Sequence, residues 1–260
     1  MAIDLRYRIV DVFSDRPLAG NGLCVVLDAA PESVMQALAR EVNLSETTYP
    51  ALVADDAYDV RIFTPNEELP FAGHPSLGTA WVLGPNTWTQ RSSGATVTVT
   101  ADAAGAVMSQ PDPVFTDIDA DDVVGALGLP GADAVVRATA AGNTFVFALA
   151  DAPIDELEPD LPGLVSAGAG MVGVVRRLDD ATLHVRVFAP GAGIAEDPGT
   201  GSAAGPIGLL ARQRWGTNAD VTIRQGAEIG RPCVIEVHAE EGALRVGGKV
   251  AACAEGRFSL

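Results

Sequence analysis

The chain has 260 residues, of which 48% are hydrophobic, and its formal net charge is −17 at pH 7. A charge of that sign repels phosphate backbones, so nucleic acid is excluded as a partner. No apolar run reaches the roughly 18–20 residues needed to cross a bilayer, and the charged first ten residues are unlike a signal peptide. Three widely spaced cysteines exclude a disulfide framework and a zinc pattern. We therefore expect a cytoplasmic protein with no membrane partner.

Hydrophobic periodicity predicts many short strands and few helices. The predicted strands lie at 7–13, 22–27, 58–63, 96–100, 106–108, 134–138, 144–148, 171–175, 182–188, 221–224, 233–238 and 244–246. Helical segments are expected at 31–42, 77–83, 118–127 and 203–212. Because the strands look mostly antiparallel and a strongly apolar helix stands near the end of each half, we predict an α+β fold. It has two similar domains, each a curled sheet around a central helix. The expected halves are 1–110, to which the C-terminal strand 250–260 can belong, and 111–249.

Three short sequence motifs occur in both halves of the chain. Arg-Ile-Phe-Thr-Pro at 61–65 matches Arg-Val-Phe-Ala-Pro at 186–190, which is 125 residues later. The glycine-rich loops that follow are 128 residues apart, so the second copy carries a three-residue insertion, and Ala-Gly-Asn occurs at both 19–21 and 141–143. Three matches in the same order at nearly one offset predict two structurally equivalent halves related by a pseudo-twofold axis.

Each half leads from a strand through a glycine loop into an apolar helix. The first backbone N–H groups of a helix lack intrahelical partners, and the helix dipole adds positive character, so such ends bind anions. In this interpretation Gly73 and His74 lie beside the N-terminus of the first helix, and Gly201 and Ser202 directly precede the second. Two such ends that face each other would bind one small carboxylate between the halves. The alternative is a pair of ordinary glycine turns that cap buried helices.

Four side chains near these loops carry usable chemistry. Glu46 stands among uncharged neighbours, where a raised pKa would suit a general acid or base, although a solvent-facing or capping glutamate is the simpler local interpretation. His74 can donate a hydrogen bond or shuttle a proton. Asp197 can reach over the second helix end to a cationic group, or can simply form an Asp-Pro turn. Ser202 can bind a ligand or cap its helix.

Other glycine-rich motifs in the chain do not fit a cofactor-binding site. Gly-Ala-Gly-Met-Val-Gly at 168–173 matches the dinucleotide fingerprint, but the residues after it predict a strand where the fingerprint requires a helix. Gly-Thr-Gly-Ser at 199–202 lacks the ending of a P-loop, and no Gly-x-Ser-x-Gly turn surrounds Ser202. His184 and His238 lie in alternating strands and are most simply structural. A dinucleotide-dependent oxidoreductase is therefore disfavoured, and neither a cofactor nor a metal is expected.

A combined pattern favours the functional interpretation of these residues. Its motifs occur in one order and are Asn43-Leu44-Ser45-Glu46-Thr47, Phe63-Thr64-Pro65, Glu68-Leu69-Pro70-Phe71-Ala72-Gly73-His74-Pro75, Asp197-Pro198-Gly199-Thr200-Gly201-Ser202-Ala203, Gln225-Gly226 and Gly230-Arg231-Pro232. The set resembles the PhzF-like family of phenazine biosynthesis, within the diaminopimelate-epimerase fold. The resemblance covers nearly the whole chain.

The resemblance implies a cofactor-independent isomerase with its active site in the cleft between two similar domains. The family's characterised isomerase acts on trans-2,3-dihydro-3-hydroxyanthranilate, a cyclic amino acid. By that likeness Glu46 would be the single proton-transferring acid/base. The substrate would be held by His74, Asp197 and Ser202, and its carboxylate would be bound by the amides around Gly73 and Gly201.

The chain also departs from its relatives. Ser76 stands where threonine is usual after His-Pro, and Gly199 stands where valine is frequent. In the epimerase and racemase relatives, cysteines at the positions of His74 and Ser202 act as paired acid and base. Two-base racemisation is therefore disfavoured here, and one-base proton relocation remains. An inactive small-carboxylate-binding member of the same fold is the alternative function, and a homodimer is compatible with the sequence.

Overall fold

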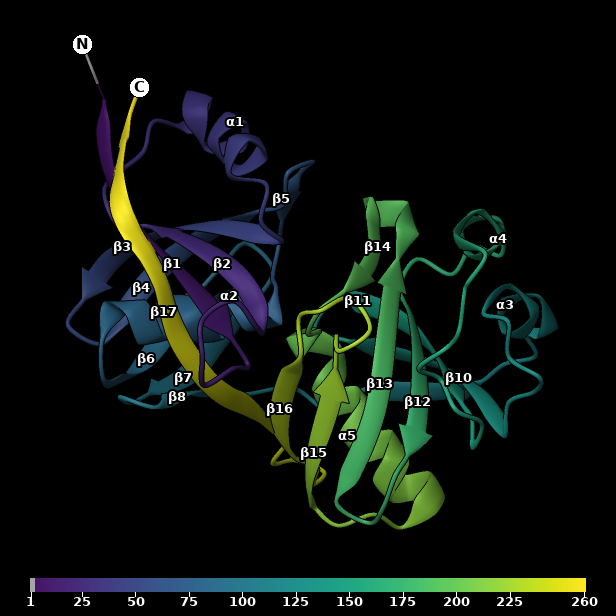
Figure 1. Ribbon diagram of the computed structural model, residues 1–260. Coiled ribbons are helices and arrows are strands. Elements are labelled where there is room, and N and C mark those ends of the chain that lie inside the picture. Colours follow the sequence, from purple (N-terminus) through teal and green to yellow (C-terminus); the bar gives the residue numbers. More distant parts are fainter. Residues whose placement is uncertain (1–2) are drawn as a thin grey trace. The chain divides into compact units, whose positions relative to one another are not determined.

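The computed structural model describes residues 3–260, and the chain forms two compact units (Figure 1). The first, here called the N-unit, holds the residues up to Ser109 together with Gly247–Leu260. The second, the C-unit, is Gln110–Val246. The polypeptide therefore leaves the N-unit once and returns to it with its last strand.

The N-unit is a ring of strands around a helix. Its elements are β1 (Asp4–Val12), β2 (Asn21–Val26), α1 (Glu32–Val42), β3 (Glu46–Ala54), β4 (Ala57–Phe63), β5 (Glu68–Leu69), α2 (Gly73–Leu83), β6 (Asn86–Arg91), β7 (Thr96–Ala101), β8 (Gly105–Ser109) and most of β17 (Arg245–Ser259). Strand pairing runs in the order β1, β2, β3, β4, β6, β7, β8 and β17, and β17 pairs again with β1. The sheet is therefore closed.

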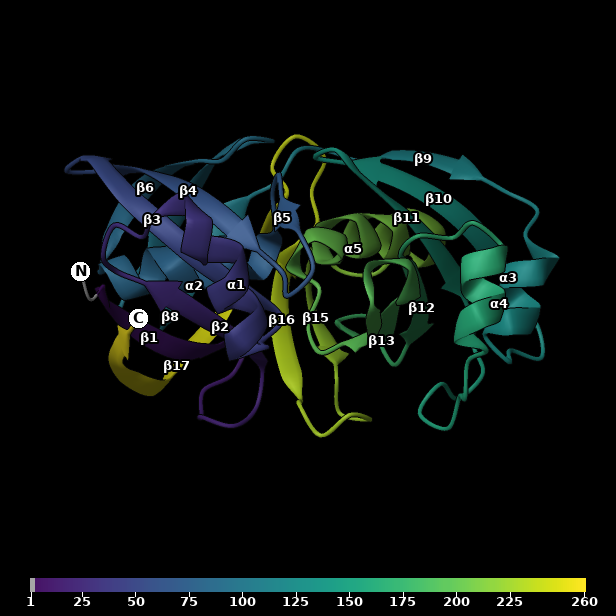
Figure 2. The same cartoon turned by 90° about the horizontal axis from the view of Figure 1, so that it is seen from above.

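Helix α2 fills the inside of this ring, as both Figure 1 and Figure 2 show. It packs against β1, β2, β3, β6, β7 and β8, and it is buried for almost its whole length. A helix that is apolar on all sides is typical of such a position. Gly78 marks the closest approach, because a Cβ atom there would lie 2.6 Å from the Leu23 side chain and 2.8 Å from that of Val12.

The C-unit is a second curled sheet with its own central helix. Its elements are β9 (Val114–Asp117), α3 (Asp121–Ala126), β10 (Ala134–Ala140), β11 (Asn143–Leu149), α4 (Leu161–Ser166), β12 (Val172–Arg177), β13 (Thr182–Ala189), η1 (Pro190–Ala192), β14 (Ile194–Asp197), α5 (Gly201–Trp215), β15 (Asp220–Gln225) and β16 (Cys233–His238). Pairing runs in the order β9, β10, β11, β12, β13, β15 and β16, with β14 on β13. In Figure 2, α5 runs through the middle of this unit.

The two units repeat one pattern of strand directions. From β1 to β7 the successive pairs are antiparallel, parallel, antiparallel, parallel and antiparallel, with β5 added to β4. From β10 to β16 the same sequence of directions recurs, with β14 added to β13. The prediction of an α+β fold with two similar domains, each a curled sheet around a helix, is confirmed.

The sequence echo at the arginines has a structural counterpart. Arg61 forms paired hydrogen bonds of 2.7 Å with Glu68 and lies over the Phe63 ring at 5.1 Å. Arg186 likewise bonds Glu196 at 3.0 and 2.8 Å and lies over Phe188 at 5.2 Å. The partner glutamate follows seven residues after the first arginine and ten residues after the second. The three-residue insertion is therefore located between β13 and β14, where η1 spans Pro190–Ala192.

Local sequence patterns missed several elements. The short strands β5, β9 and β14, the strands β3 and β6, and helix α4 were not predicted. The strands expected at 244–246 and 250–260 are parts of one strand, β17. Strand β17 runs along β1, at the other end of the chain, and this pairing makes one continuous strand of it. The strand predicted after the Gly-x-Gly-x-x-Gly match is confirmed as β12, so the helix that a dinucleotide site needs does not follow it. Within residues 3–260, no helix is long and apolar enough to cross a membrane.

Candidate active site

Glu46 is the first residue of β3 and pairs in parallel with Leu23 of β2. Helix α1 ends just before it, because Asn43 adopts a left-handed conformation with φ of 52°. Glu46 is only 7% exposed. The solvent-facing interpretation of this glutamate is therefore wrong.

His74 brings a second titratable group to Glu46. It is the second residue of α2 and is buried, and its Nε2 atom lies 3.1 Å from Oε2 of Glu46. Its Nδ1 atom lies 3.3 Å from Nδ2 of Asn21 at the start of β2. Burial lowers the pKa of His74 to about 3, although a hydrogen bond with the Gly22 backbone partly opposes this. The imidazole is therefore neutral at ordinary pH.

One proton can lie between Nε2 of His74 and Oε2 of Glu46, carried by either atom. A neutral imidazole carries a single ring proton, so Nε2 either donates to an ionised Glu46 or accepts from a protonated Glu46. At 3.1 Å between Nε2 and Oε2, either arrangement is a favourable contact, whereas two bare lone pairs would repel. The two protonation states of Glu46 are both accommodated, which is what a group that takes and later returns a proton requires.

The depressed pKa of His74 predicts how stability depends on pH. The unfolded residue titrates near 6.5 and the folded one near 3, so between these values only the unfolded chain binds the proton. The stabilising contribution of the neutral ring is complete above pH 6.5 and is lost progressively as the pH falls toward 3. We expect His74→Gln to lose less unfolding free energy than the parent between about pH 7 and pH 4.5, as measured by urea denaturation. An equal loss in both proteins would contradict a buried neutral His74.

A buried chain of hydrogen bonds fixes the start of α2. The Tyr58 hydroxyl donates to Gln90 Oε1 at 2.7 Å, Gln90 Nε2 donates to Ser76 Oγ at 2.7 Å, and Ser76 Oγ donates to the Ala72 carbonyl at 2.8 Å. No side chain caps the helix N-terminus at Ala72. The replacement of the usual threonine by Ser76 therefore keeps the hydroxyl group that holds the backbone before Gly73.

The start of α5 is arranged in a comparable way. The helix begins at Gly201, two residues earlier than the sequence predicted, and Thr200 occupies the N-cap position without a side-chain capping bond. Ser202 lies inside the first turn, so the alternative in which Ser202 caps the helix is wrong. The Gly201 carbonyl accepts a hydrogen bond of 2.8 Å from Gln110 Nε2. That the starts of α2 and α5 face one ligand stays a prediction.

Asp197 lies at the end of β14, directly before the loop that leads into α5. Its Oδ2 atom accepts a hydrogen bond of 2.6 Å from the Thr200 hydroxyl, and its backbone carbonyl accepts one of 2.8 Å from Gln225 Nε2. The Asp-Pro turn expected from sequence is thus combined with a carboxylate held in a fixed direction. That Asp197 pairs with a cationic ligand group stays a prediction.

The other two histidines have partners on their own sheet. His184 Nε2 lies 2.7 Å from Oε1 of Glu228, and His238 lies 2.7 Å from Asp220 and 3.2 Å from Glu240. These contacts join neighbouring strands and turns of the C-unit. They fit the structural role expected for both residues.

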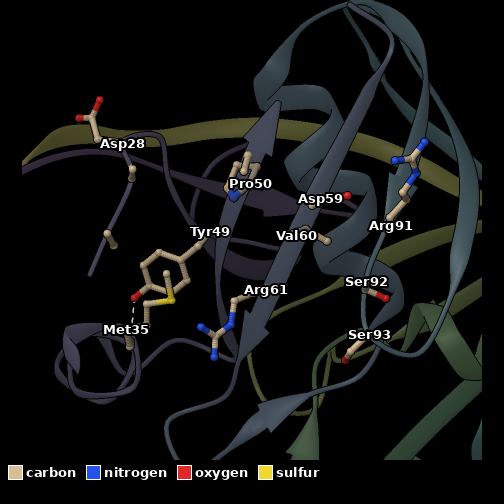
Figure 3. Close-up of a pocket in the computed structure, with 13 residues that line it drawn as sticks. Asp28, Met35, Tyr49, Pro50, Asp59, Val60, Arg61, Arg91, Ser92 and Ser93 are labelled. Carbon is tan, nitrogen blue, oxygen red and sulfur yellow. Dashed lines mark hydrogen bonds between the residues drawn. The ribbon is translucent and has the colours of Figure 1, made fainter. Parts of the chain in front are cut away.

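A hollow of about 510 Å³ also lies in the N-unit, and none of the candidate site residues lines it (Figure 3). Its wall includes Tyr49, whose hydroxyl donates to the Met35 carbonyl at 2.8 Å, and Arg61, whose guanidinium is already bound to Glu68. These two polar groups are thus engaged within the protein. The hollow lacks a buried acid/base of the kind that Glu46 provides.

Sequence reasoning missed several residues that position the candidate groups. They are Asn21, Gln90, Thr200 and Gln225. Asn21 lies in the repeated Ala-Gly-Asn motif, and Thr200 and Gln225 lie in motifs that resemble the PhzF-like family. The sequence therefore marked these three residues but did not indicate what they do. Gln90 sits in a strand that the sequence did not predict, and no motif marks it.

Comparisons with known proteins identify the family. A model described as "Phenazine biosynthesis-like protein" (PhzC-PhzF) matches residues 10–256. The chain belongs to this family. Trans-2,3-dihydro-3-hydroxyanthranilate isomerase of Pseudomonas aeruginosa is 37% identical, and the match covers 98% of this chain and 99% of that protein. The protein of the same name from Pseudomonas chlororaphis is 38% identical over 90% of each chain.

Solved structures share the fold of this chain. A predicted epimerase from Pseudomonas aeruginosa has a TM-score of 0.78 and 32% identity, covering 98% of this chain and 99% of that one. A PhzF-family protein from Bacillus anthracis (TM-score 0.85, 22% identity, 99% and 100% covered) shows the same fold. So does a hydroxyproline epimerase from Agrobacterium vitis (TM-score 0.64, 12% identity, 99% and 93% covered). The chain is thus an enzyme of an isomerase and epimerase family.

Proposed function

We propose that this PhzF-family protein is a cofactor-independent isomerase that relocates a proton on a small, cyclic, amino-acid-like carboxylate. The observation that carries the proposal is the buried carboxyl group of Glu46, 3.1 Å from a neutral imidazole in the N-unit. The 37% identical relative named trans-2,3-dihydro-3-hydroxyanthranilate isomerase supports the same reaction class and suggests the substrate.

Glu46 is the single acid/base in this mechanism. As a carboxylate it removes a proton from one carbon of the substrate, and the electron pair of the broken C–H bond moves into the conjugated system. As a carboxylic acid it then returns the proton to a different carbon, which restores the carboxylate. No atom is gained or lost and no oxidant is needed. His74 stays neutral throughout and holds the Glu46 carboxyl group in both protonation states.

In this proposal, residues at or near the starts of α2 and α5 bind the substrate. The backbone N–H groups at Gly73 and Gly201 bind the substrate carboxylate, because they lack intrahelical partners and lie at the positive ends of α2 and α5. Asp197 pairs with the substrate amine, and Ser202 adds a hydrogen bond. The net charge of −17 opposes anion approach at long range, but the aligned amides dominate within a few ångströms.

Racemisation by two thiols is not part of the proposal. Neither helix start carries a cysteine, since His74 and Ser202 occupy the positions at which racemase relatives have them. Cys24 and Cys233 are buried in strands, and burial raises the pKa of Cys24 to about 12, so that thiol is inert at neutral pH. We therefore assign the acid/base role to a single carboxyl group, that of Glu46.

Incubation with trans-2,3-dihydro-3-hydroxyanthranilate in D2O tests the proposal. We expect NMR to show conversion to an isomer, with deuterium at the carbon that receives the proton, because a glutamic acid exchanges its proton with solvent. The parent protein and a Glu46→Gln control are compared side by side. Binding of this compound without isomerisation or deuterium uptake would instead identify an inactive carboxylate-binding protein.

A further inference from the structure

The loop between β14 and α5 is held by one buried side chain, that of Gln225. Gln225 is the last residue of β15, is 2% exposed, and is fixed by pairing with Cys233 on one side and Val185 on the other. Its amide makes bonds to both ends of the loop. Nε2 donates to the Asp197 carbonyl at 2.8 Å and to Thr200 Oγ1 at 3.0 Å, and Oε1 accepts from the Thr200 N–H at 3.2 Å.

These partners leave only one orientation for the Gln225 amide. The Thr200 N–H can only donate and the Asp197 carbonyl can only accept, so exchanging the amide nitrogen and oxygen would turn both contacts into repulsions. Both Nε2 hydrogens are then used. Because Thr200 Oγ1 accepts one of them, its own hydrogen is directed to Asp197 Oδ2, at 2.6 Å. The direction of each hydrogen bond in this series is therefore determined by Gln225.

The backbone beside Gln225 supports the same loop. Gly226 has a φ of 78°, and a Cβ atom at this residue would lie 2.4 Å from the Pro198 carbonyl oxygen and 2.5 Å from that of Arg231. The loop thus rests directly on a glycine that no other residue can replace without displacing backbone. The Gln-Gly pair thus contacts Asp197, Pro198 and Thr200, the N-cap residue of α5.

We propose that Gln225 is a positioning residue for substrate binding, which acts through the Thr200 hydroxyl on the Asp197 carboxylate. This role rests on the proposed function, in which Asp197 binds the substrate amine. Gln225 touches no reacting atom. It keeps the Asp197 carboxylate in the direction that binding requires. Thr200 is the intermediary between the two side chains, because its hydroxyl accepts from Gln225 and donates to Asp197.

Three variants test this relay, by which we mean the series of hydrogen bonds from Gln225 through the Thr200 hydroxyl to the Asp197 carboxylate. Gln225→Met keeps the size but removes the Nε2 donors and the Oε1 acceptor. Thr200→Val keeps the shape but removes the hydroxyl, and Thr200→Ser restores it. Because the relay orients a group that binds substrate and transition state alike, we expect Gln225→Met and Thr200→Val to raise KM by about 10- to 100-fold with kcat changed by less than about threefold. Thr200→Ser should stay close to the parent. The double variant should add little to either single change, since both act through one series of bonds.

A binding measurement separates failure of the relay from failure of the proposed function. Anthranilate, a stable aromatic amino carboxylate, is titrated calorimetrically into each variant. A weakened affinity in Thr200→Val that Thr200→Ser restores supports the relay, even if the parent protein turns over no substrate. Unchanged KM and unchanged anthranilate affinity in Gln225→Met and Thr200→Val would overturn it, even if the parent is an active isomerase. A purely structural role would instead lower the urea midpoint and kcat together, without rescue by serine.

Discussion

Replacement of Glu46 by glutamine is expected to reduce turnover by roughly 10²-fold or more, the usual contribution of a general acid/base. Glutamine keeps the size and polarity of the side chain, and its amide can still donate to or accept from His74, so the buried site stays filled. It cannot take up or release a proton. Isomerisation and solvent-deuterium uptake, followed by NMR under saturating substrate, provide the measurement.

Glu41→Gln is the matched control for this substitution. Glu41 is an exposed glutamate near the end of α1, and it contributes to neither the His74 contact nor the helix starts. We expect the control to keep the parent rate and the Glu46→Gln protein to keep substrate affinity within a few fold. If Glu46→Gln isomerised a proven substrate at the parent rate, Glu46 would be structural, and His74 would become the next candidate acid/base.

The second large effect is expected on stability, from Arg186→Met. The side chains of Arg186 and its partner Glu196 are 7% and 8% exposed, and Arg186 also donates to the carbonyls of Ile154 and Leu157 at 2.9 and 2.8 Å. Removal of the arginine leaves the Glu196 carboxylate and two carbonyls buried without this partner. We expect a loss of about 3–5 kcal/mol of unfolding free energy, the usual cost of breaking a buried ion pair.

The duplicated architecture supplies the control for this prediction. Arg61 makes equivalent contacts with Glu68 and the Phe63 ring, and it also lies 3.2 Å from Glu32, but the Arg61 and Glu68 side chains are 36% and 37% exposed. Because solvent screens the N-unit pair, Arg61→Met should cost only about 0–1 kcal/mol. Urea denaturation of both variants gives the comparison. Equal small losses would show that burial of the Arg186 pair contributes little.

Arg186→Met should also weaken substrate binding, because Glu196 directly precedes Asp197 on β14. The same arginine therefore links stability of the C-unit to the carboxylate that is proposed to bind the amine. A loss of stability without any loss of affinity would show that the Thr200 and Gln225 bonds hold Asp197 by themselves.

The positions of the two central helices could be predicted from sequence because their signals are local. A glycine loop followed by a continuous apolar run predicts buried helices at 77–83 and 203–212, and the observed helices Gly73–Leu83 and Gly201–Trp215 contain these segments. The repeated Arg-x-Phe pattern is also local, and its two copies make equivalent contacts in the two units. The α+β class and the duplication could therefore be predicted from the amino-acid sequence alone.

Burial and contact partners could not be predicted in this way, because strand pairing creates them. Glu46 resembles an exposed glutamate in its own sequence, and it becomes buried only because β3 pairs in parallel with β2 inside a closed ring. His74 reaches it from 28 residues away, and Asn21 in turn contacts His74 from 53 residues away.

The sequence by itself determined the repeat, the presence of the two central helices and the family resemblance, because each of these depends on short consecutive motifs. Only the tertiary structure decided that Glu46 is enclosed beside a neutral His74, and that Gln225 holds Asp197 through Thr200. The physical reason is that hydrophobic period and turn chemistry act between near neighbours. The pKa of a buried group and the direction of a hydrogen bond depend instead on atoms brought together by distant strands.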